Sequence, residues 1–254
     1  MKKQVIKTIQ YLLKYFNTQL VKINNNQIPI DIEKKYHSVM NHSNAYTMTS
    51  FERMYALVGA VEYISNNNIK GDIVECGVWR GGSMLAVANT LIDLDQTDRN
   101  LWLYDTFEGM PLPTDEDFSC RTGDAKVKFE ETKIDNESSD WCRATLDDVK
   151  HTLSLSKYPV DNIHYIKGMV ETTIPAIMPE KIALLRLDTD WYESTKHELK
   201  NLYPLLVPGG VLIIDDYGHW EGCRKAVDEY FETLDKSPLL IRVDYTGRVA
   251  IKPV

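Results

Sequence analysis

The amino-acid sequence predicts an α/β fold built on a mostly parallel β-sheet. Two patterns carry this prediction: short apolar segments alternate with segments of helical periodicity, and most of the apolar segments end at an acidic residue. Alternating strands and helices are typical of βαβ units, whose strands run parallel. The apolar segments are nearly continuous, which is expected when helices cover both faces of the sheet.

The first 50 residues are predicted to form a helical appendage. Apolar residues recur at helical spacing from Val5 to Leu20, and this stripe either packs on the body of the protein or forms a dimer interface. Polar residues interrupt the stripe, so it lacks the continuous apolar segment of a secretory signal. A second helix is expected from about Phe51 to Asn66, where a run of asparagines ends it.

The elements of the body follow in a regular order. Strands are expected at 72–76, 101–104, 163–166, 182–187 and 211–214, and helices at 83–91, 193–205 and 222–234. Residues 208–210 are predicted to turn into the last of these strands. The segments 239–245 and 248–252 predict a closing antiparallel hairpin. Residues 106–150 are polar and long for a connection, so they predict an inserted lid or a surface excursion.

Composition excludes several classes of function. The 254 residues include 29 Lys and Arg and 37 Asp and Glu, for a net charge of −8. This balance argues against a nucleic-acid binder, which needs a clustered basic face. No apolar run approaches the ~20 residues of a membrane span. The four cysteines form no CxxC pair, so we expect reduced thiols and a cytoplasmic protein.

Acidic residues gather where the predicted strands end, at Glu75, Asp105, Asp188, Asp190, Asp215 and Asp216. Ligands of open parallel sheets bind outside the carboxyl ends of the strands. Crowded carboxylates repel one another, and a divalent cation removes that penalty. Ligands that are all oxygen are typical of Mg²⁺, Mn²⁺ or Ca²⁺. Asp188, Asp215 and Asp216 are therefore candidate metal ligands, unless they only cap the helices that follow.

The first predicted strand runs into a glycine-rich turn from Glu75 to Ser83. Trp79 occupies the middle glycine position of the dinucleotide fingerprint, and the turn lacks the lysine of a phosphate-binding P-loop. Two interpretations remain: a tight turn with no ligand, or the acidic glycine loop of S-adenosylmethionine-dependent methyltransferases, where an acid favours the cationic sulfonium. In the second case, Asp105 can accept hydrogen bonds from both hydroxyls of a ribose.

Several longer segments occur in order between about residues 45 and 252: Tyr46–Thr49, Gly71–Ser83, Tyr104–Met110, Leu185–Thr195, Asp215–Gly218 and Gly222–Arg224. Together they resemble the macrocin O-methyltransferase family of bacterial sugar methyltransferases. The resemblance implies a Rossmann-like class I methyltransferase fold. This is an α/β fold with a seven-stranded, mostly parallel sheet, a C-terminal antiparallel hairpin and helices on both faces. It also implies a methyltransferase domain over 51–254, with a lid built from 1–50 and 106–150.

The resemblance further implies an enzyme that transfers a methyl group from S-adenosylmethionine, with Mg²⁺, to a sugar hydroxyl of a natural product or glycan. It puts Asp188, Asp215 and Asp216 on the metal. The cofactor-binding residues it implies are Thr47, Met48, Glu75, Cys76, Gly77, Gly81, Ser83, Asp105, Thr106, Gly168 and Asp188. It implies a small-molecule acceptor as partner and a homodimer or larger homo-oligomer.

The catalytic base departs from the pattern of related catechol-type methyltransferases. Those enzymes carry a lysine three residues beyond the first metal aspartate, where this sequence has Trp191. Asp188 is the first candidate for the proton acceptor, and Asp190 and His219 are alternatives.

Other functions also remain open for this sequence. They are a methyltransferase for a non-sugar or peptide hydroxyl, a metal-dependent hydrolase or phosphotransferase, and a binding protein without activity. The missing lysine argues against phosphate chemistry. The intact glycine loop and Asp188 argue against a protein that only binds.

Overall fold

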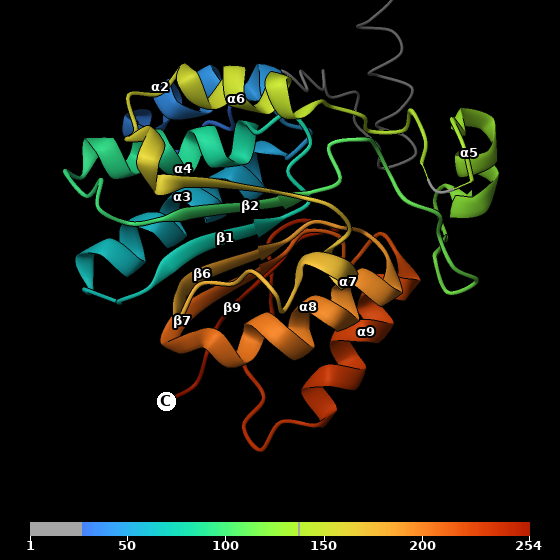
Figure 1. Ribbon diagram of the computed structural model, residues 1–254. Helices are drawn as coiled ribbons and strands as arrows, with labels where there is room; N and C mark the ends of the chain where they lie inside the picture. Colours follow the sequence, from blue (N-terminus) through green and yellow to red (C-terminus); the bar gives the residue numbers. More distant parts are fainter. Residues whose placement is uncertain (1–26, 137) are drawn as a thin grey trace, which may run out of the picture. The chain divides into compact units, whose positions relative to one another are not determined.

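The computed structural model describes residues 27–136 and 138–254 (Figure 1). The predicted helix from Val5 to Leu20 lies outside the described residues. Residues 32–254 form one unit, and its centre is a seven-stranded sheet in the order β5-β2-β1-β6-β7-β9-β8. The strands are β1 (Asp72–Cys76), β2 (Leu101–Asp105), β5 (Ile163–Lys167), β6 (Ile182–Leu187), β7 (Leu206–Ile214), β8 (Ile241–Arg242) and β9 (Arg248–Ile251).

Five neighbouring strands, from β5 to β7, run parallel, and β9 pairs antiparallel with both β7 and β8. This confirms the predicted seven-stranded, mostly parallel sheet with its closing hairpin. The chain proceeds from β1 to β2 and β5 on one side, and later enters β6 and β7 on the other. The carboxyl ends of β1 and β6 therefore meet at a switch point in strand order, where open α/β sheets bind ligands.

Helices cover both faces of the sheet, as predicted (Figure 1). One face carries α3 (Phe51–Asn66) and α4 (Gly82–Asp93), with α2 (Lys34–Ser43) and α6 (Leu146–Ser154) packed on α4. The other face carries α7 (Val170–Thr173), α8 (Tyr192–Leu202) and α9 (Glu221–Glu232). None of the helices in the described ranges is long and apolar enough to cross a membrane.

Two predicted boundaries are wrong for identifiable reasons. Residues 208–210 lie inside β7 and not in a turn, because the pairing of β6 with β7 shifts between Ile182 and Leu184 and absorbs the extra residues as a bulge. The helix expected to reach residue 205 ends at Leu202, and a 3₁₀ turn follows over Tyr203–Leu205. Pro204 has no amide hydrogen with which to continue the α-helix.

The segment 106–150 is folded against the body. It contains the hairpin β3 (Phe118–Ser119) and β4 (Gly123–Asp124), followed by α5 (Ala125–Thr132). Asp117 is fully buried, and its carboxylate accepts hydrogen bonds from the amides of Thr114 at 2.7 Å and Tyr192 at 2.8 Å. This contact ties the segment to the first turn of α8. That the segment acts as a lid stays a prediction.

Three tryptophans join this segment to the loops that follow β6 and β7. Trp141, Trp191 and Trp220 pack edge to face, with ring centroids 5.1–6.1 Å apart. Trp191 is the residue that replaces the lysine of the catechol-type enzymes. It is buried, and its indole nitrogen donates to the carbonyl of Pro111 at 3.1 Å.

Candidate active site

Two adjoining pockets open at the carboxyl ends of β1, β2, β6 and β7. The first, the glycine-loop pocket, is lined among others by Gly77, Asp105, Thr106 and Gly168. The second, the acidic pocket, is lined among others by Thr47, Arg53, Ser83, Asp215 and Asp216. The two pockets share the wall formed by Met48, Trp79, Asp188 and Asp190. Sequence positions far apart are thus brought together at the switch point.

The glycine loop turns sharply after β1 because Gly77 has a left-handed backbone with φ +82°. Its amide donates to the carbonyl of Tyr104 at 2.9 Å, and the amide of Asp188 donates to the carbonyl of Cys76 at 2.9 Å. A Cβ at Gly77 would overlap the carbonyl oxygen of Asp188. The loop is therefore pressed against the start of the aspartate-bearing loop after β6.

We expect the Gly77→Ala variant to lose at least about 3 kcal/mol of unfolding free energy, because a strained φ adds to a backbone overlap. Gly123→Ala is the matched control. Gly123 has φ +88°, but a Cβ there would meet nothing within 4 Å, so only the cost of the left-handed backbone remains, about 1 kcal/mol. Urea unfolding of both variants measures the difference. Equal losses would contradict the packing of Gly77 against the Asp188 loop.

Asp105 organises the glycine loop at the end of β2. One carboxylate oxygen accepts from the amides of Val78 at 2.7 Å and Trp79 at 3.1 Å, and the other accepts from the amide of Phe107 at 2.6 Å. Burial raises the pKa of Asp105, and these hydrogen bonds to the ionised form oppose the rise. Asp105, which the sequence predicts to bind the ribose hydroxyls of the cofactor, therefore also holds the shape of the loop.

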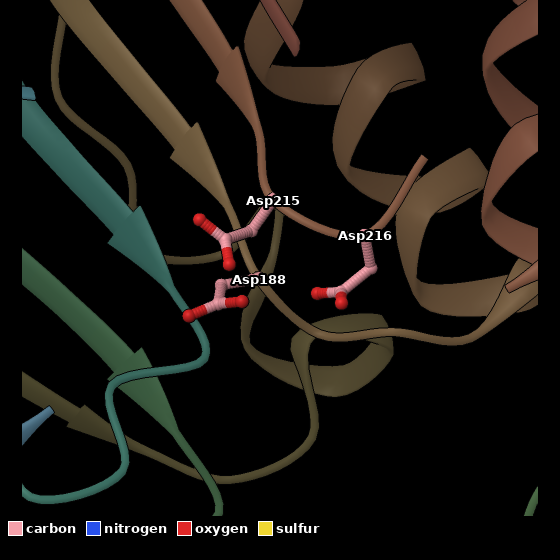
Figure 2. Close-up of side chains that lie close together, drawn as sticks. All are labelled: Asp188, Asp215 and Asp216. Carbon is pink, nitrogen blue, oxygen red and sulfur yellow. The ribbon is translucent and has the colours of Figure 1, made fainter. Parts of the chain in front are cut away.

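Asp188, Asp215 and Asp216 point toward one another from the ends of β6 and β7 (Figure 2). Each offers one carboxylate oxygen, and these oxygens lie within 4.8 Å of one another. Burial raises the pKa of Asp188 well above its usual value, although the charge of Arg186 opposes the rise. The nearby Asp216 raises this pKa further. This all-oxygen set fits a hard divalent cation such as Mg²⁺.

Asp190 completes the acidic wall. It has a left-handed backbone with φ +69°, which non-glycine residues seldom adopt. Burial, with Asp216 next, raises the pKa of this carboxyl well above its usual value. Asp190 thus lines both pockets, in surroundings that raise the affinity of its carboxylate for a proton.

Arg186 is the central residue that the sequence reasoning missed. It is 2% exposed, and its guanidinium donates to Glu75 at 2.6 Å, to Asp188 at 2.7 Å and to Asp215 at 2.6 Å. It also donates to the hydroxyl of Thr49 at 2.9 Å. The available signal was an arginine inside the otherwise apolar strand 182–187, because a buried guanidinium requires acidic partners.

Three of the predicted cofactor residues line neither pocket. Glu75 is fully buried beneath it, on Arg186, and burial raises its pKa to about 7 against the opposing effect of that arginine. Cys76 is buried in the apolar core. Gly81 packs against α6, where a Cβ would come within 2.9 Å of Leu153.

The remaining predicted cofactor residues line one or both pockets. Met48, Gly77, Asp105, Thr106, Gly168 and Asp188 line the glycine-loop pocket. Thr47 and Ser83 line the acidic pocket, with their hydroxyl oxygens 3.5 Å apart.

His219 lies beside the acidic pocket and is not among the described residues that line it. Its ring nitrogens are 3.0 Å from the hydroxyl of Tyr245 and 3.4 Å from the hydroxyl of Thr122. Burial lowers the pKa of His219, and the nearby Asp216 opposes this.

Comparison with known proteins places this chain in a family. The model of the family described as Macrocin-O-methyltransferase (TylF) matches residues 2–251. The chain is 33% identical over 205 residues to demethyldecarbamoylnovobiocin O-methyltransferase of Streptomyces niveus, covering 81% of this chain and 75% of that protein. It is 34% identical over 205 residues, with the same coverage, to the 8-demethyl-8-(2,3-dimethoxy-alpha-L-rhamnosyl)-tetracenomycin-C 4'-O-methyltransferase of Streptomyces olivaceus.

A solved structure, that of the O-methyltransferase NovP, shares the fold. It superposes with a TM-score of 0.74 at 31% identity, over 85% of this chain and 88% of NovP. The matched regions contain both strand ends that supply the acidic cluster, because the family model extends over residues 2–251. The chain therefore belongs to the macrocin O-methyltransferase family and is a methyltransferase.

Proposed function

We propose that this enzyme transfers a methyl group from S-adenosylmethionine to a sugar hydroxyl of a small natural-product glycoside, with a bound divalent cation. The observation that carries the proposal is the wall that the two pockets share. A donor in the glycine-loop pocket and an acceptor in the acidic pocket would meet at Asp188 and Asp190. The names of the relatives support a natural-product acceptor, and one of them contains a rhamnosyl group.

The charge of the glycine-loop pocket supports a sulfonium donor. Among the described residues that line it, none is basic, and four are acidic: Asp105, Glu171, Asp188 and Asp190. A cationic ligand is favoured by such walls, whereas a di- or triphosphate would find no counter-charge. This argues against the hydrolase and phosphotransferase alternatives.

The acidic pocket supports the metal. Asp188, Asp215 and Asp216 would hold it, and a bound Mg²⁺ would lower the pKa of an acceptor hydroxyl and fix its orientation. The enzyme's own residues would then position the acceptor and receive its proton.

We propose Asp190 as the proton acceptor, in place of Asp188. Asp188 contacts Arg186 and is assigned to the metal, so it is a weakened base. His219 is engaged with Tyr245 and Thr122. Asp190 faces both pockets, and the raised pKa of its carboxyl makes the carboxylate a stronger base than that of an exposed aspartate.

Titration calorimetry of the full chain with S-adenosylmethionine and S-adenosylhomocysteine, with and without Mg²⁺, tests the proposal. We expect both to bind at micromolar concentration, and Mg²⁺ to bind to the protein. Failure of both ligands to bind would contradict the methyltransfer proposal. A panel of deoxysugar glycosides, with the matching aglycones as controls, then tests the acceptor class by mass spectrometry. Methylation of the aglycones alone would contradict a sugar acceptor.

A further inference from the structure

Two guanidinium groups occupy the carboxylate of Asp215, one of the three proposed metal ligands. Arg186 donates to one oxygen at 2.6 Å, and Arg53 donates to the other. Among the described residues, Arg186 is the arginine that contacts Asp188, and the contacts described for Asp216 include no arginine. Asp215 is therefore the ligand most engaged by internal cations.

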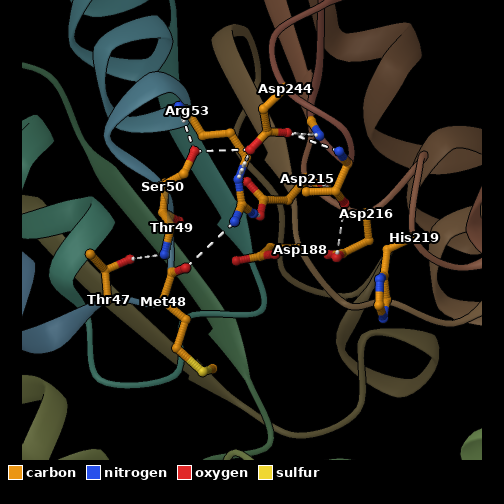
Figure 3. A network of polar contacts seen from close by, with 12 residues as sticks. Thr47, Met48, Thr49, Ser50, Arg53, Asp188, Asp215, Asp216, His219 and Asp244 are labelled. Atoms are coloured by element: carbon orange, nitrogen blue, oxygen red, sulfur yellow. Dashed lines mark hydrogen bonds and ion pairs between the residues drawn. The ribbon is translucent and has the colours of Figure 1, made fainter. Parts of the chain in front are cut away.

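Arg53 lies in the first turn of α3, where neighbouring residues fix its side chain (Figure 3). Its Nε forms an ion pair with the carboxylate of Asp244 at 3.2 Å without a hydrogen bond, and the same carboxylate accepts a hydrogen bond from the hydroxyl of Ser50 at 2.9 Å. A Cβ at Gly247 would come within 2.8 Å of the Arg53 stem. The turn between β8 and β9 thus packs against the aliphatic stem, with Nε beside Asp244 and a terminal nitrogen on Asp215.

The second guanidinium nitrogen of Arg53 reaches the carbonyl of Met48 at 3.4 Å. Met48 belongs to the wall shared by both pockets. Each of the three guanidinium nitrogens of Arg53 thus has its own oxygen partner, and only one of these partners, Asp215, is a proposed metal ligand.

Arg53 and Arg186 differ in burial and in the acidic residues that pair with them outside Asp215. Arg186 is fully buried and has the buried Glu75 as its own counter-charge. Arg53 is 14% exposed and has Asp244, which lies outside the metal cluster. A divalent cation that takes an oxygen of Asp215 must share that carboxylate with Arg53 and approach a like charge. Arg53 can give up Asp215 and keep a partner outside the cluster, whereas Arg186 also contacts Asp188, a second proposed metal ligand.

We propose that Arg53 is an internal counter-ion that competes with the divalent cation for Asp215 and thereby weakens metal binding. The proposal rests on the metal site of the proposed function. When the cation binds, Arg53 releases Asp215 and retains Asp244 and the Met48 carbonyl. Metal binding then changes the contact of Arg53 with Met48, which belongs to the wall shared with the glycine-loop pocket.

Binding of Mn²⁺ to the full chain, measured by electron paramagnetic resonance, tests the competition. We expect Arg53→Gln to bind Mn²⁺ about tenfold more tightly, and Arg53→Lys to stay within about threefold of the unsubstituted protein, because lysine keeps the charge. The double variant Arg53→Gln with Asp244→Asn keeps the net charge and is expected to bind more tightly than the unsubstituted protein. Arg242→Gln, on the exposed β8, is the control for a lost surface charge.

Unchanged or weaker binding by Arg53→Gln would overturn the proposal. So would a return of the double variant to the affinity of the unsubstituted protein, because the effect would then be general charge and not competition at Asp215. If the unsubstituted protein itself fails to bind Mn²⁺, the proposed metal site is contradicted, and so is the proposed role of Arg53. If the unsubstituted protein binds and Arg53→Gln binds equally, only the role of Arg53 is lost.

A measurement on the unsubstituted protein covers the case in which Arg53→Gln does not fold. The Nη–H signals of Arg53, one of whose Nη atoms contacts Asp215, are assigned in a nitrogen-15 NMR spectrum by their loss in Arg53→Lys. We expect these signals to shift as Mg²⁺ is added, in step with Mg²⁺ binding. Signals that do not move while Mg²⁺ binds would overturn the proposal.

Discussion

Replacing Asp188 by asparagine is expected to weaken Mn²⁺ binding at least about 100-fold and to lower methyl transfer about 10³-fold. Among the described residues, Asp188 is the one that lines both pockets and also belongs to the proposed metal-binding cluster. Asparagine keeps the shape of the side chain and removes the charge that a divalent cation requires. The loss should therefore appear in metal affinity and in turnover together.

The stability of the same variant separates a functional role from a structural one. Burial and the neighbouring Asp216 raise the pKa of Asp188, so the folded protein disfavours its ionised form. Asparagine relieves that cost, and we expect a thermal midpoint no lower than that of the unsubstituted protein. Asp161→Asn, in an exposed turn, is the control that loses one negative charge elsewhere. Unchanged Mn²⁺ affinity in Asp188→Asn would remove Asp188 from the metal site.

Replacing Arg186 by methionine is expected to cost about 3–5 kcal/mol of unfolding free energy at pH 7. Methionine fills much of the space but removes the guanidinium that contacts Glu75, Asp188 and Asp215. Buried carboxylates without a counter-charge are strongly destabilising. Urea unfolding measures the loss, with Arg242→Met as the exposed control.

The pH dependence of this variant has a defined sign. Glu75 is buried, and its pKa is raised to about 7 in the folded protein even beside Arg186. A raised folded-state pKa contributes stability that is present below the unfolded value of 4.5 and is lost as pH rises through the folded value. Removing Arg186 raises that folded value further, so the deficit of Arg186→Met should shrink as pH falls from 7 toward 5.

A double variant checks which charge causes the loss. Glu75→Gln added to Arg186→Met removes the most buried of the uncompensated carboxylates, and we expect it to recover part of the lost stability at pH 7. A loss below about 1 kcal/mol in Arg186→Met would contradict a central role for the buried ion pairs, because exposed pairs contribute no more than that.

The strands and the edge that bears the site were predictable because local patterns determine them. The strands from 72–76 to 211–214 are nearly continuous apolar runs, and each must be covered on both faces. The acids that follow them meet at one edge because parallel strands bring their carboxyl ends together. The register bulge in β7 was not predictable, because it depends on pairing between Ile182 and Leu206 across the sheet.

The ion pairs of the site could not be predicted from the sequence. Arg53 and Asp215 are 162 positions apart, and Arg186 and Glu75 are 111 positions apart. Their charges are visible in the sequence, but which charges face each other depends on the sheet order. The same holds for Glu75, which is fully buried against Arg186 and lines neither pocket. By contrast, α6 was missed although Thr145 and Asp148 form a capping box that the sequence displays.

The position of β1 at the centre of the sheet has a consequence for synthesis on the ribosome. β1 ends at Cys76, and its partner β6 begins only at Ile182, so residues 77–181 must be made before that side of β1 is covered. Until then, one buried strand presents unpaired backbone groups and apolar side chains, which invite pairing with other chains. Folding depends on this non-local pairing and is slowed by it. The nascent chain is therefore most prone to aggregation before β6 emerges, and the shared wall of the two pockets can form only after that moment.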